Sequence, residues 1–118
     1  MTSLSKTHRL ASREVRLVFA HGEKEKGKGV SLYHKKNNMR ESRFAVVVSS
    51  KVAKKSVSRN RLRRQTKDVL HHFVSSIKRG YDIIIVFHMM FSRRKDIEDS
   101  VRGVLEKKSL LFYGKKNI

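Results

Sequence analysis

The densest concentration of charge in this 118-residue chain lies near its middle, between Glu41 and Asp68, where no acidic residue occurs. The stretch carries the basic residues Arg43, Lys51, Lys54, Lys55, Arg59, Arg61, Arg63, Arg64 and Lys67. An arginine offers a planar fork of donors that matches phosphate oxygens, and the amide of Asn60 can both donate to and accept from a base edge or a ribose hydroxyl. These residue types suit structured RNA. A solvated basic face is the alternative, and the absence of acids favours phosphate binding over it.

Most of these residues are expected on one long helix, which Ser56 or Ser58 can cap and Gly80 can end. Its apolar side is formed by Leu62, Val69, Leu70, Phe73 and Ile77. The opposite side is formed by Asn60, Arg64, Lys67 and His71, at helical spacing. The amide groups and partial positive charge of the helix N-terminus would hold phosphates together with the side chains.

Two aromatic residues form a second candidate site. Single-stranded nucleic acid is commonly held by aromatic rings that stack on bases inside a basic groove. Phe19 and Tyr33 are the candidates for this role. The alternative is that both rings belong to the core of a small domain, and the sequence leaves both interpretations open.

Nothing in the sequence predicts a catalytic or metal site on the protein itself. The six histidines, at positions 8, 21, 34, 71, 72 and 88, form no spacing typical of a metal site. There is no cysteine, no GxSxG motif and no glycine-rich phosphate loop. Asp96, Glu98 and Asp99 lie where a helix favours negative charge at its start, so we interpret them as capping residues.

The composition predicts a polyanionic partner. With 29 Lys and Arg against 10 Asp and Glu, the formal charge is +19 and the isoelectric point about 10.9. Such a charge repels itself unless a polyanion neutralises it. No apolar run approaches the roughly 20 residues of a membrane span, and the N-terminus has no apolar segment typical of a signal peptide. We expect a cytoplasmic protein with neither a membrane nor DNA among its partners.

The periodicity predicts an α+β fold in a single domain, residues 1–118, with a core at about 9–111. A short helix over residues 12–21, capped by Ser12 and ended by Gly22, is followed by an edge or hairpin strand that begins at Val30. Residues 44–48 are expected as a central strand covered on both faces, and residues 81–87 as a buried strand, joined by the long helix as a crossover. Ser92 is expected to cap a last helix with Ile97, Val101, Val104 and Leu105 inward, and residues 110–118 are expected as a tail.

Residues 49–70, SSKVAKKSVSRNRLRRQTKDVL, resemble the signature of the bacterial ribonuclease P protein. The hallmark of that family is Arg-Asn-Arg, an aliphatic residue and two basic residues, which residues 59–64 reproduce. RLASREVRLVFAHG is similar to the opening helix of the family, FAVVVSSK to the strand before the signature and YDIIIVF to the strand after the long helix. The resemblance covers residues 9–111 in order. It implies an α/β sandwich with a central, mostly four-stranded sheet, three helices and a left-handed β-α-β crossover.

The resemblance also implies a division of labour. The catalytic RNA, using bound magnesium ions, removes the 5′ leader of precursor tRNA, while the protein binds both RNAs and no cofactor of its own. The residues implied to contact the catalytic RNA are Arg59, Asn60, Arg61, Arg63, Arg64 and Lys67, with Lys51, Lys54 and Lys55 helping from the preceding loop. The residues implied to line the leader cleft are Val15, Phe19 and Tyr33. Val15 stands where the family often has phenylalanine, and Ala53 and Lys54 stand where a glycine is frequent.

Three other functions share some of these features. A structural or ribosomal RNA-binding protein has the same charge and size but needs no leader cleft. A DNA-binding protein could place the long helix in a major groove, although no adjoining helix with the turn of a helix-turn-helix is present. A free-standing nuclease would need an acid-base or metal cluster, which the sequence lacks.

Overall fold

The computed structural model describes residues 8–111, and the predicted residues 112–118 of the tail lie outside them. The elements in chain order are α1 (Ser12–His21), β1 (Glu23–Lys26), β2 (Val30–Lys36), β3 (Arg43–Val47), α2 (Ser56–Phe73), the 3₁₀ turn η2 (Val74–Ser76), β4 (Tyr81–Phe87) and α3 (Arg94–Lys107). The predicted α+β class, with a four-stranded sheet and three α-helices, is confirmed.

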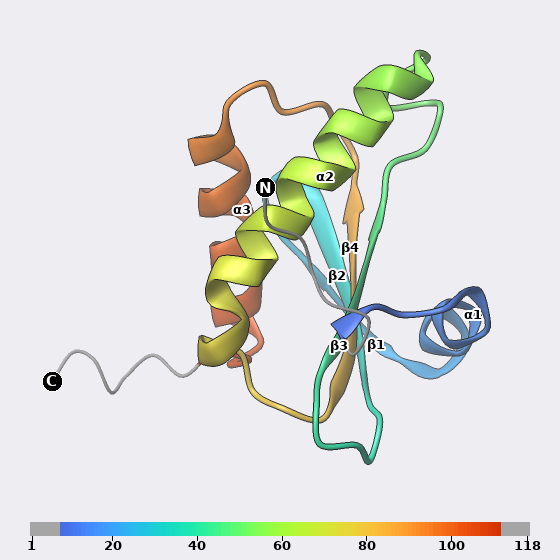
Figure 1. Ribbon diagram of the computed structural model, residues 1–118, viewed down its shortest axis with the longest axis vertical. Coiled ribbons are helices and arrows are strands. Elements are labelled where there is room, and N and C mark those ends of the chain that lie inside the picture. The colour runs from blue at the N-terminus through green and yellow to red at the C-terminus, as the bar shows by residue number, and fades with distance from the viewer. Residues whose placement is uncertain (1–7, 112–118) are drawn as a thin grey trace, which may run out of the picture.

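The sheet has the strand order β1-β2-β4-β3. The first two pairings are antiparallel, and β3 runs parallel to β4, so α2 is the crossover between two neighbouring strands. Figure 1 shows α2 and α3 on one side of the sheet and α1 on the other. The sheet therefore has one face that two helices cover and one face that a single short helix covers in part.

The core lies between the sheet and the helices α2 and α3. Ile83, Ile85 and Phe87 of β4 point into it, together with Leu62 and Val69 of α2. Strand β4 is buried, as predicted, and lies between β2 and β3 in the sheet. Strand β3 is not central: it forms an edge of the sheet, and its residues alternate between buried and half-buried.

The helices begin one or more residues away from the predicted serine caps. The N-cap residues are Ala11, Lys55 and Arg93, and none of them makes a side-chain capping hydrogen bond. At α1 the capping contact comes from within the helix, because the Ala11 amide donates to Glu14 Oε1 at 3.1 Å. Gly22 ends α1 as predicted, with its amide donating to the Val18 carbonyl at 2.7 Å.

Three further boundaries differ from the sequence-based expectation. Helix α2 ends at Phe73, where η2 replaces it, so Ile77 is buried but lies beyond the helix. The charged residues Glu23–Lys26 form strand β1, which the sequence did not predict. Leu110 and Leu111 are buried rather than part of a free tail, and Leu111 forms a β-bridge with Ile77.

His34 of β2 makes the stability of the fold depend on pH. Its Nε2 is buried without a hydrogen-bond partner, 3.9 Å from Glu23 Oε1. Burial lowers the pKa of His34. The negative charge of Glu23 acts to raise this pKa, whereas the positive charge of Lys108 lowers it further. The unfolded chain therefore binds a proton at His34 more readily than the folded chain does.

We expect the free energy of unfolding to fall as the pH drops below about 6.5, the pKa of an unperturbed histidine. Urea denaturation at a series of pH values between about 5 and 8 measures this. His34→Gln should make the free energy of unfolding depend less on pH. His71→Gln, which alters an exposed histidine, should leave the pH dependence as it is in the wild type. An unchanged slope in His34→Gln would show that another group is responsible.

Candidate RNA-binding site

The start of α2 and the loop before it form a surface without acidic side chains. The first turn of α2 contains no acid, and no side chain caps its amide groups. Lys51, Lys54 and Lys55 of the preceding loop are exposed. The free amides and the partial positive charge of the helix N-terminus thus lie beside three ammonium groups, which is an arrangement suited to phosphate.

Arg59 has a structural role that sequence reasoning missed. Its Nη1 donates to the carbonyl oxygens of Ala53 and Lys54, each at 2.9 Å. The arginine therefore ties the loop to α2 and fixes the positions of the nearby lysines. No pattern in the sequence marks this bond, because the carbonyl groups become acceptors only through the turn that the loop makes.

The next residues of α2 divide into paired and unpaired side chains. Arg63 Nη2 donates to the side-chain oxygen of Asn60, so the Asn60 amide nitrogen keeps its donors for another partner. Arg61 and Arg64 are exposed, and within residues 8–111 neither makes a side-chain hydrogen bond or ion pair. These two guanidinium groups are the ones most available to an RNA.

Lys67 continues the basic side of α2 and is half-buried. Desolvation lowers its pKa, and the charges of Arg63 and Arg9 lower it further. Arg9, in the segment before α1, therefore belongs to the same group of cations, which the sequence did not predict. A phosphate beside the three side chains would relieve their repulsion and raise the pKa of Lys67 again.

On the other side of the sheet, α1 brings the predicted aromatic residues together. The rings of Phe19 and Tyr33 meet edge to face with centroids 4.8 Å apart, and Lys24 Nζ lies 5.6 Å from the centroid of the Tyr33 ring. Phe19 is 41% exposed and Tyr33 is half-buried, so this pair lies at the surface and not in the core. Val15 is half-buried on the same helix.

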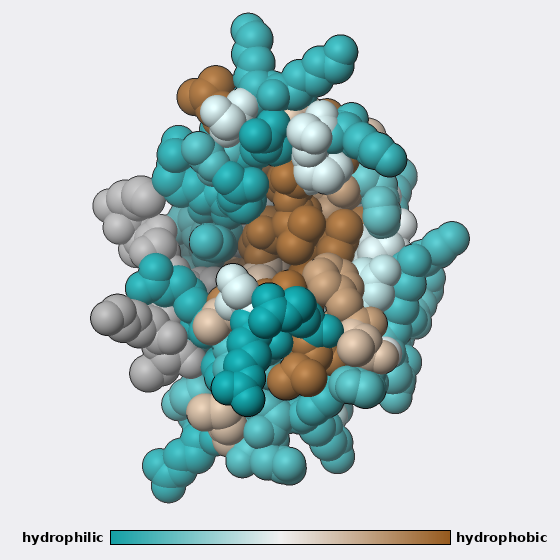
Figure 2. Space-filling model, turned by 90° about the vertical axis from the view of Figure 1, so that its right-hand side faces the viewer, coloured by the Kyte–Doolittle hydropathy of each residue, from teal (hydrophilic) through white to brown (hydrophobic). Residues whose placement is uncertain are grey.

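The sheet supplies an apolar floor beside this pair. In the register of the sheet, Ile84 of β4 lies between Tyr33 of β2 and Ala45 of β3. Two residues further along, Val86 of β4 lies beside Val47 of β3. Ala45, Val47 and Val86 are half-buried. Figure 2 shows apolar surface in the middle of the α1 side of the molecule, with hydrophilic residues around it. An exposed apolar strip with an aromatic pair and a basic rim can accept the bases of a single strand.

The remaining candidate groups of the sequence are accounted for by local contacts. Asp96 pairs with Arg93, Glu98 with Arg94 and Asp99 with Lys95, so Asp96 lies in the first turn of α3 as expected, whereas Glu98 and Asp99 bind side chains one turn before them. Within residues 8–111 no three His, Asp or Glu side chains come close enough to share a metal ion. No helix in that range is long and apolar enough to cross a membrane.

Comparison with known proteins decides the family. A family model described as Ribonuclease P matches residues 4–109, which is most of the chain. The ribonuclease P protein component of Clostridium acetobutylicum is 33% identical over 109 residues, which cover 89% of this chain and 91% of that protein. The chain belongs to the family of ribonuclease P protein components.

Further members of the ribonuclease P family agree with this assignment. The protein component of a Synechocystis strain is 51% identical over 45 residues, which cover 38% of this chain and 36% of that protein. The solved ribonuclease P protein of Staphylococcus aureus superposes with a TM-score of 0.80, over 91% of this chain and 99% of that one, at 18% identity, and supports the fold. The recognition of the family from its signature is thus confirmed, and no comparison favours a ribosomal or other structural RNA-binding protein.

Proposed function

We propose that the protein acts within ribonuclease P by holding the catalytic RNA with the basic side of α2 and the 5′ leader of precursor tRNA with the α1 side of the sheet. The observation that carries this proposal is the separation of two different surfaces. One surface has, within residues 8–111, unpaired guanidinium groups and helix amides with no acid in the first turn of α2, and the other has the aromatic pair of Phe19 and Tyr33 beside an apolar floor. A folded RNA and a single strand need these two kinds of surface.

The residues that we assign to the catalytic RNA act in three ways. Arg61 and Arg64 would contact phosphates directly, because their guanidinium groups are free. Arg59 would position the loop that carries Lys51, Lys54 and Lys55. Asn60, Arg63 and Lys67 would form a second row along α2, together with Arg9.

Charge explains how a protein without a catalytic cluster can assist the reaction. The catalytic RNA and the precursor are both polyanions and repel each other. A protein with a formal charge of +19 between them lowers this repulsion and releases counterions from both. We propose a cytoplasmic enzyme in which the protein raises the affinity for precursor tRNA.

We propose that the chemistry belongs to the RNA. Magnesium ions supply a Lewis acid and an activated water for phosphodiester hydrolysis. The surface at the start of α2 is rich in cations, which repel Mg²⁺, so RNA phosphates are the more favourable ligands for it. The groups of the protein then act on RNA phosphates and bases alone.

Removal of the aromatic pair tests the leader assignment. In a holoenzyme reconstituted with catalytic RNA, Phe19→Ala with Tyr33→Ala should weaken binding of leader-bearing precursor by about 10-fold or more, because each stacked base contributes about 1–3 kcal/mol. Binding of tRNA without a leader should change less than about twofold. Leu17→Ala is the matched control, since Leu17 is an exposed apolar residue on the opposite side of α1. Equal losses for both substrates would contradict the leader assignment.

A further inference from the structure

A basic hollow, separate from the basic surface at the start of α2, lies at the opposite end of the sheet. The turn between β2 and β3 meets the loop that follows η2 at that end, at the bottom of Figure 1. The hollow has a volume of about 450 Å³ and is lined by Lys36, Asn38, Lys78, Arg79, Gly80 and Tyr81. None of these residues belongs to the signature of the family or to the aromatic pair.

Hydrogen bonds join the two segments that form this hollow. The backbone amide of Asn37 donates to the backbone carbonyl of Gly80 at 2.9 Å. The buried hydroxyl of Ser42 donates to the Lys78 carbonyl at 2.6 Å and accepts from the Tyr81 amide at 3.0 Å. The turn and the loop are therefore held in one arrangement and do not move independently.

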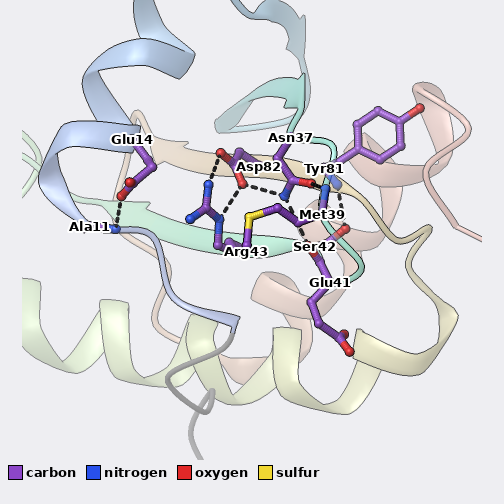
Figure 3. Close-up of polar contacts among 9 residues, drawn as sticks. All are labelled: Ala11, Glu14, Asn37, Met39, Glu41, Ser42, Arg43, Tyr81 and Asp82. Carbon is purple, nitrogen blue, oxygen red and sulfur yellow. Dashed lines mark hydrogen bonds and ion pairs between the residues drawn. The ribbon is translucent and has the colours of Figure 1, made fainter.

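Figure 3 shows the polar side chains beneath this surface. The Asn37 side chain donates to Asp82 Oδ1 at 2.8 Å and to the Glu41 carbonyl at 3.1 Å, and its oxygen accepts from the Met39 amide at 2.8 Å. Arg43 donates to both oxygens of Asp82, at 2.9 and 2.8 Å. Because Asp82 is only 6% exposed, its charge serves these partners and does not neutralise the lysines of the hollow.

The backbone at the hollow adopts conformations that its residue types favour. Asn38 and Gly80 both have positive φ, at 58° and 86°. Asparagine and glycine tolerate this left-handed region better than other residues do. A Cβ atom on Gly80 would lie 3.3 Å from the Met39 carbonyl oxygen, so the close approach of the two segments also favours glycine.

The hollow gathers positive charge that the described residues do not compensate. Lys36, Lys78 and Arg79 line it, Arg40 lies in the turn beside it, and none of the four forms an ion pair within residues 8–111. The carboxylate of Glu41, in the same turn, lies 3.6 Å from His8. Fixing several cations around one concave surface is unfavourable unless an anion binds there.

We propose that this hollow binds backbone phosphates of the catalytic RNA, as a second contact remote from the α2 site. The inference rests on the proposed function. Two observations favour the catalytic RNA over the leader. First, Tyr81 lies on the sheet face that α2 and α3 cover, since it shares that face of β4 with the core residues Ile83 and Ile85. Second, the loop with Lys78 and Arg79 directly follows α2 and η2 in the chain. An RNA that lies along α2 reaches the hollow, whereas the leader cleft faces the other way.

Two remote contacts would fix the orientation of the protein on the RNA. The molecule is 40 Å long, and the two loops that form the hollow lie at the opposite end of the view in Figure 1 from the start of α2. A folded RNA that binds one end presents the other contact at a high effective concentration. The rigid network beneath the hollow keeps its cations in place for this second contact.

The test is a double substitution of the exposed cations Lys36→Gln and Arg79→Gln. Affinity of the full-length protein for the catalytic RNA is measured over a series of salt concentrations. We expect about tenfold weaker binding, and a salt slope smaller in magnitude by about 2 because two phosphate contacts are lost. The matched control is Lys95→Gln with Lys107→Gln, which removes the same charge from exposed side chains of α3 and should change the slope by less than about 0.5.

Each other outcome overturns the inference in a defined way. Equal effects of the two double variants would show that only net charge matters and that the hollow is no site. Weaker binding of precursor tRNA to the preassembled holoenzyme, with unchanged affinity for the catalytic RNA, would assign the hollow to the substrate. If the wild-type protein itself does not bind the catalytic RNA, that result contradicts the proposed function, and with it the inference about the hollow. Thermal unfolding of both variants, expected within about 2 °C of wild type, confirms that they fold.

Discussion

Arg61→Gln with Arg64→Gln should weaken binding of the catalytic RNA by about 100-fold at moderate salt. Both guanidinium groups are exposed at the start of α2 and have no partner within the described part of the chain. A hydrogen bond to a charged group contributes about 1.5 kcal/mol or more, so two such contacts account for a loss of this size. The fold should be unaffected, because neither side chain supports another part of the protein.

Filter binding or fluorescence anisotropy with the labelled catalytic RNA measures this loss. The slope of the logarithm of the binding constant against the logarithm of the salt concentration should be smaller in magnitude by about 2. Lys95→Gln with Lys107→Gln serves again as the control of equal charge. Arg59→Gln differs from both, because it also releases the loop that holds Lys51 and Lys54. Binding that is equally strong in the Arg61 and Arg64 variant would show that α2 is a solvated basic helix and not the RNA contact.

Asp82→Ala should lower the stability of the protein by about 3 kcal/mol. Asp82 is buried and accepts hydrogen bonds from Arg43 and from Asn37, so its removal takes both carboxylate acceptors from a half-buried guanidinium group and one of two acceptors from the Asn37 side chain. Breaking a buried pair from one side costs about 3–5 kcal/mol. For a domain of this size the melting temperature should fall by about 10 °C.

Thermal unfolding followed by circular dichroism measures this change. Arg43→Met with Asp82→Leu removes both charges together and should recover much of the lost stability, since a buried ion pair replaced by apolar groups is often neutral. Asp99→Ala is the control, because Asp99 is exposed and its one ion pair within residues 8–111 is with Lys95 at 3.8 Å. A loss of less than about 1 kcal/mol in Asp82→Ala would show that the network of Figure 3 does not stabilise the sheet.

The periodic parts of the sequence predicted the fold well. Helix α1 has the predicted bounds, and Leu62, Val69 and Leu70 of α2 are buried as their spacing indicated. Apolar residues at helical spacing must face a core, so the buried side of a helix can be predicted without knowing which elements pack against it. The serine caps were wrong because a cap is worth about 1 kcal/mol, and packing of the helix can move its start by a residue against that.

The misplaced strand has a functional explanation. The apolar run at residues 44–48 was interpreted as a strand covered on both faces, but β3 is an edge strand with Ala45 and Val47 half-buried. On the α1 side these residues form the floor of the proposed leader cleft. An apolar run that serves a binding surface looks, in the sequence, like one that serves a core.

Features that carry no apolar pattern of their own could not be predicted. Strand β1 is held by its pairing with β2, and its sequence of alternating Glu and Lys carries no apolar pattern. The bond from Arg59 to the loop and the hollow at Lys36 and Arg79 both depend on turns that bring separate segments together. The residue types of the proposed RNA-binding surface were visible in the sequence, whereas the contacts among them required the structure.

The most direct test of the central claim is cleavage of precursor tRNA by a bacterial ribonuclease P RNA at low magnesium, with the protein, without it, and with the protein alone. We expect 5′-leader removal that is fast only when RNA and protein are both present, because the protein lowers the repulsion that magnesium would otherwise have to screen. Tight RNA binding without stimulation would contradict the role in leader removal, and cleavage by the protein alone would contradict the assignment of the chemistry to the RNA.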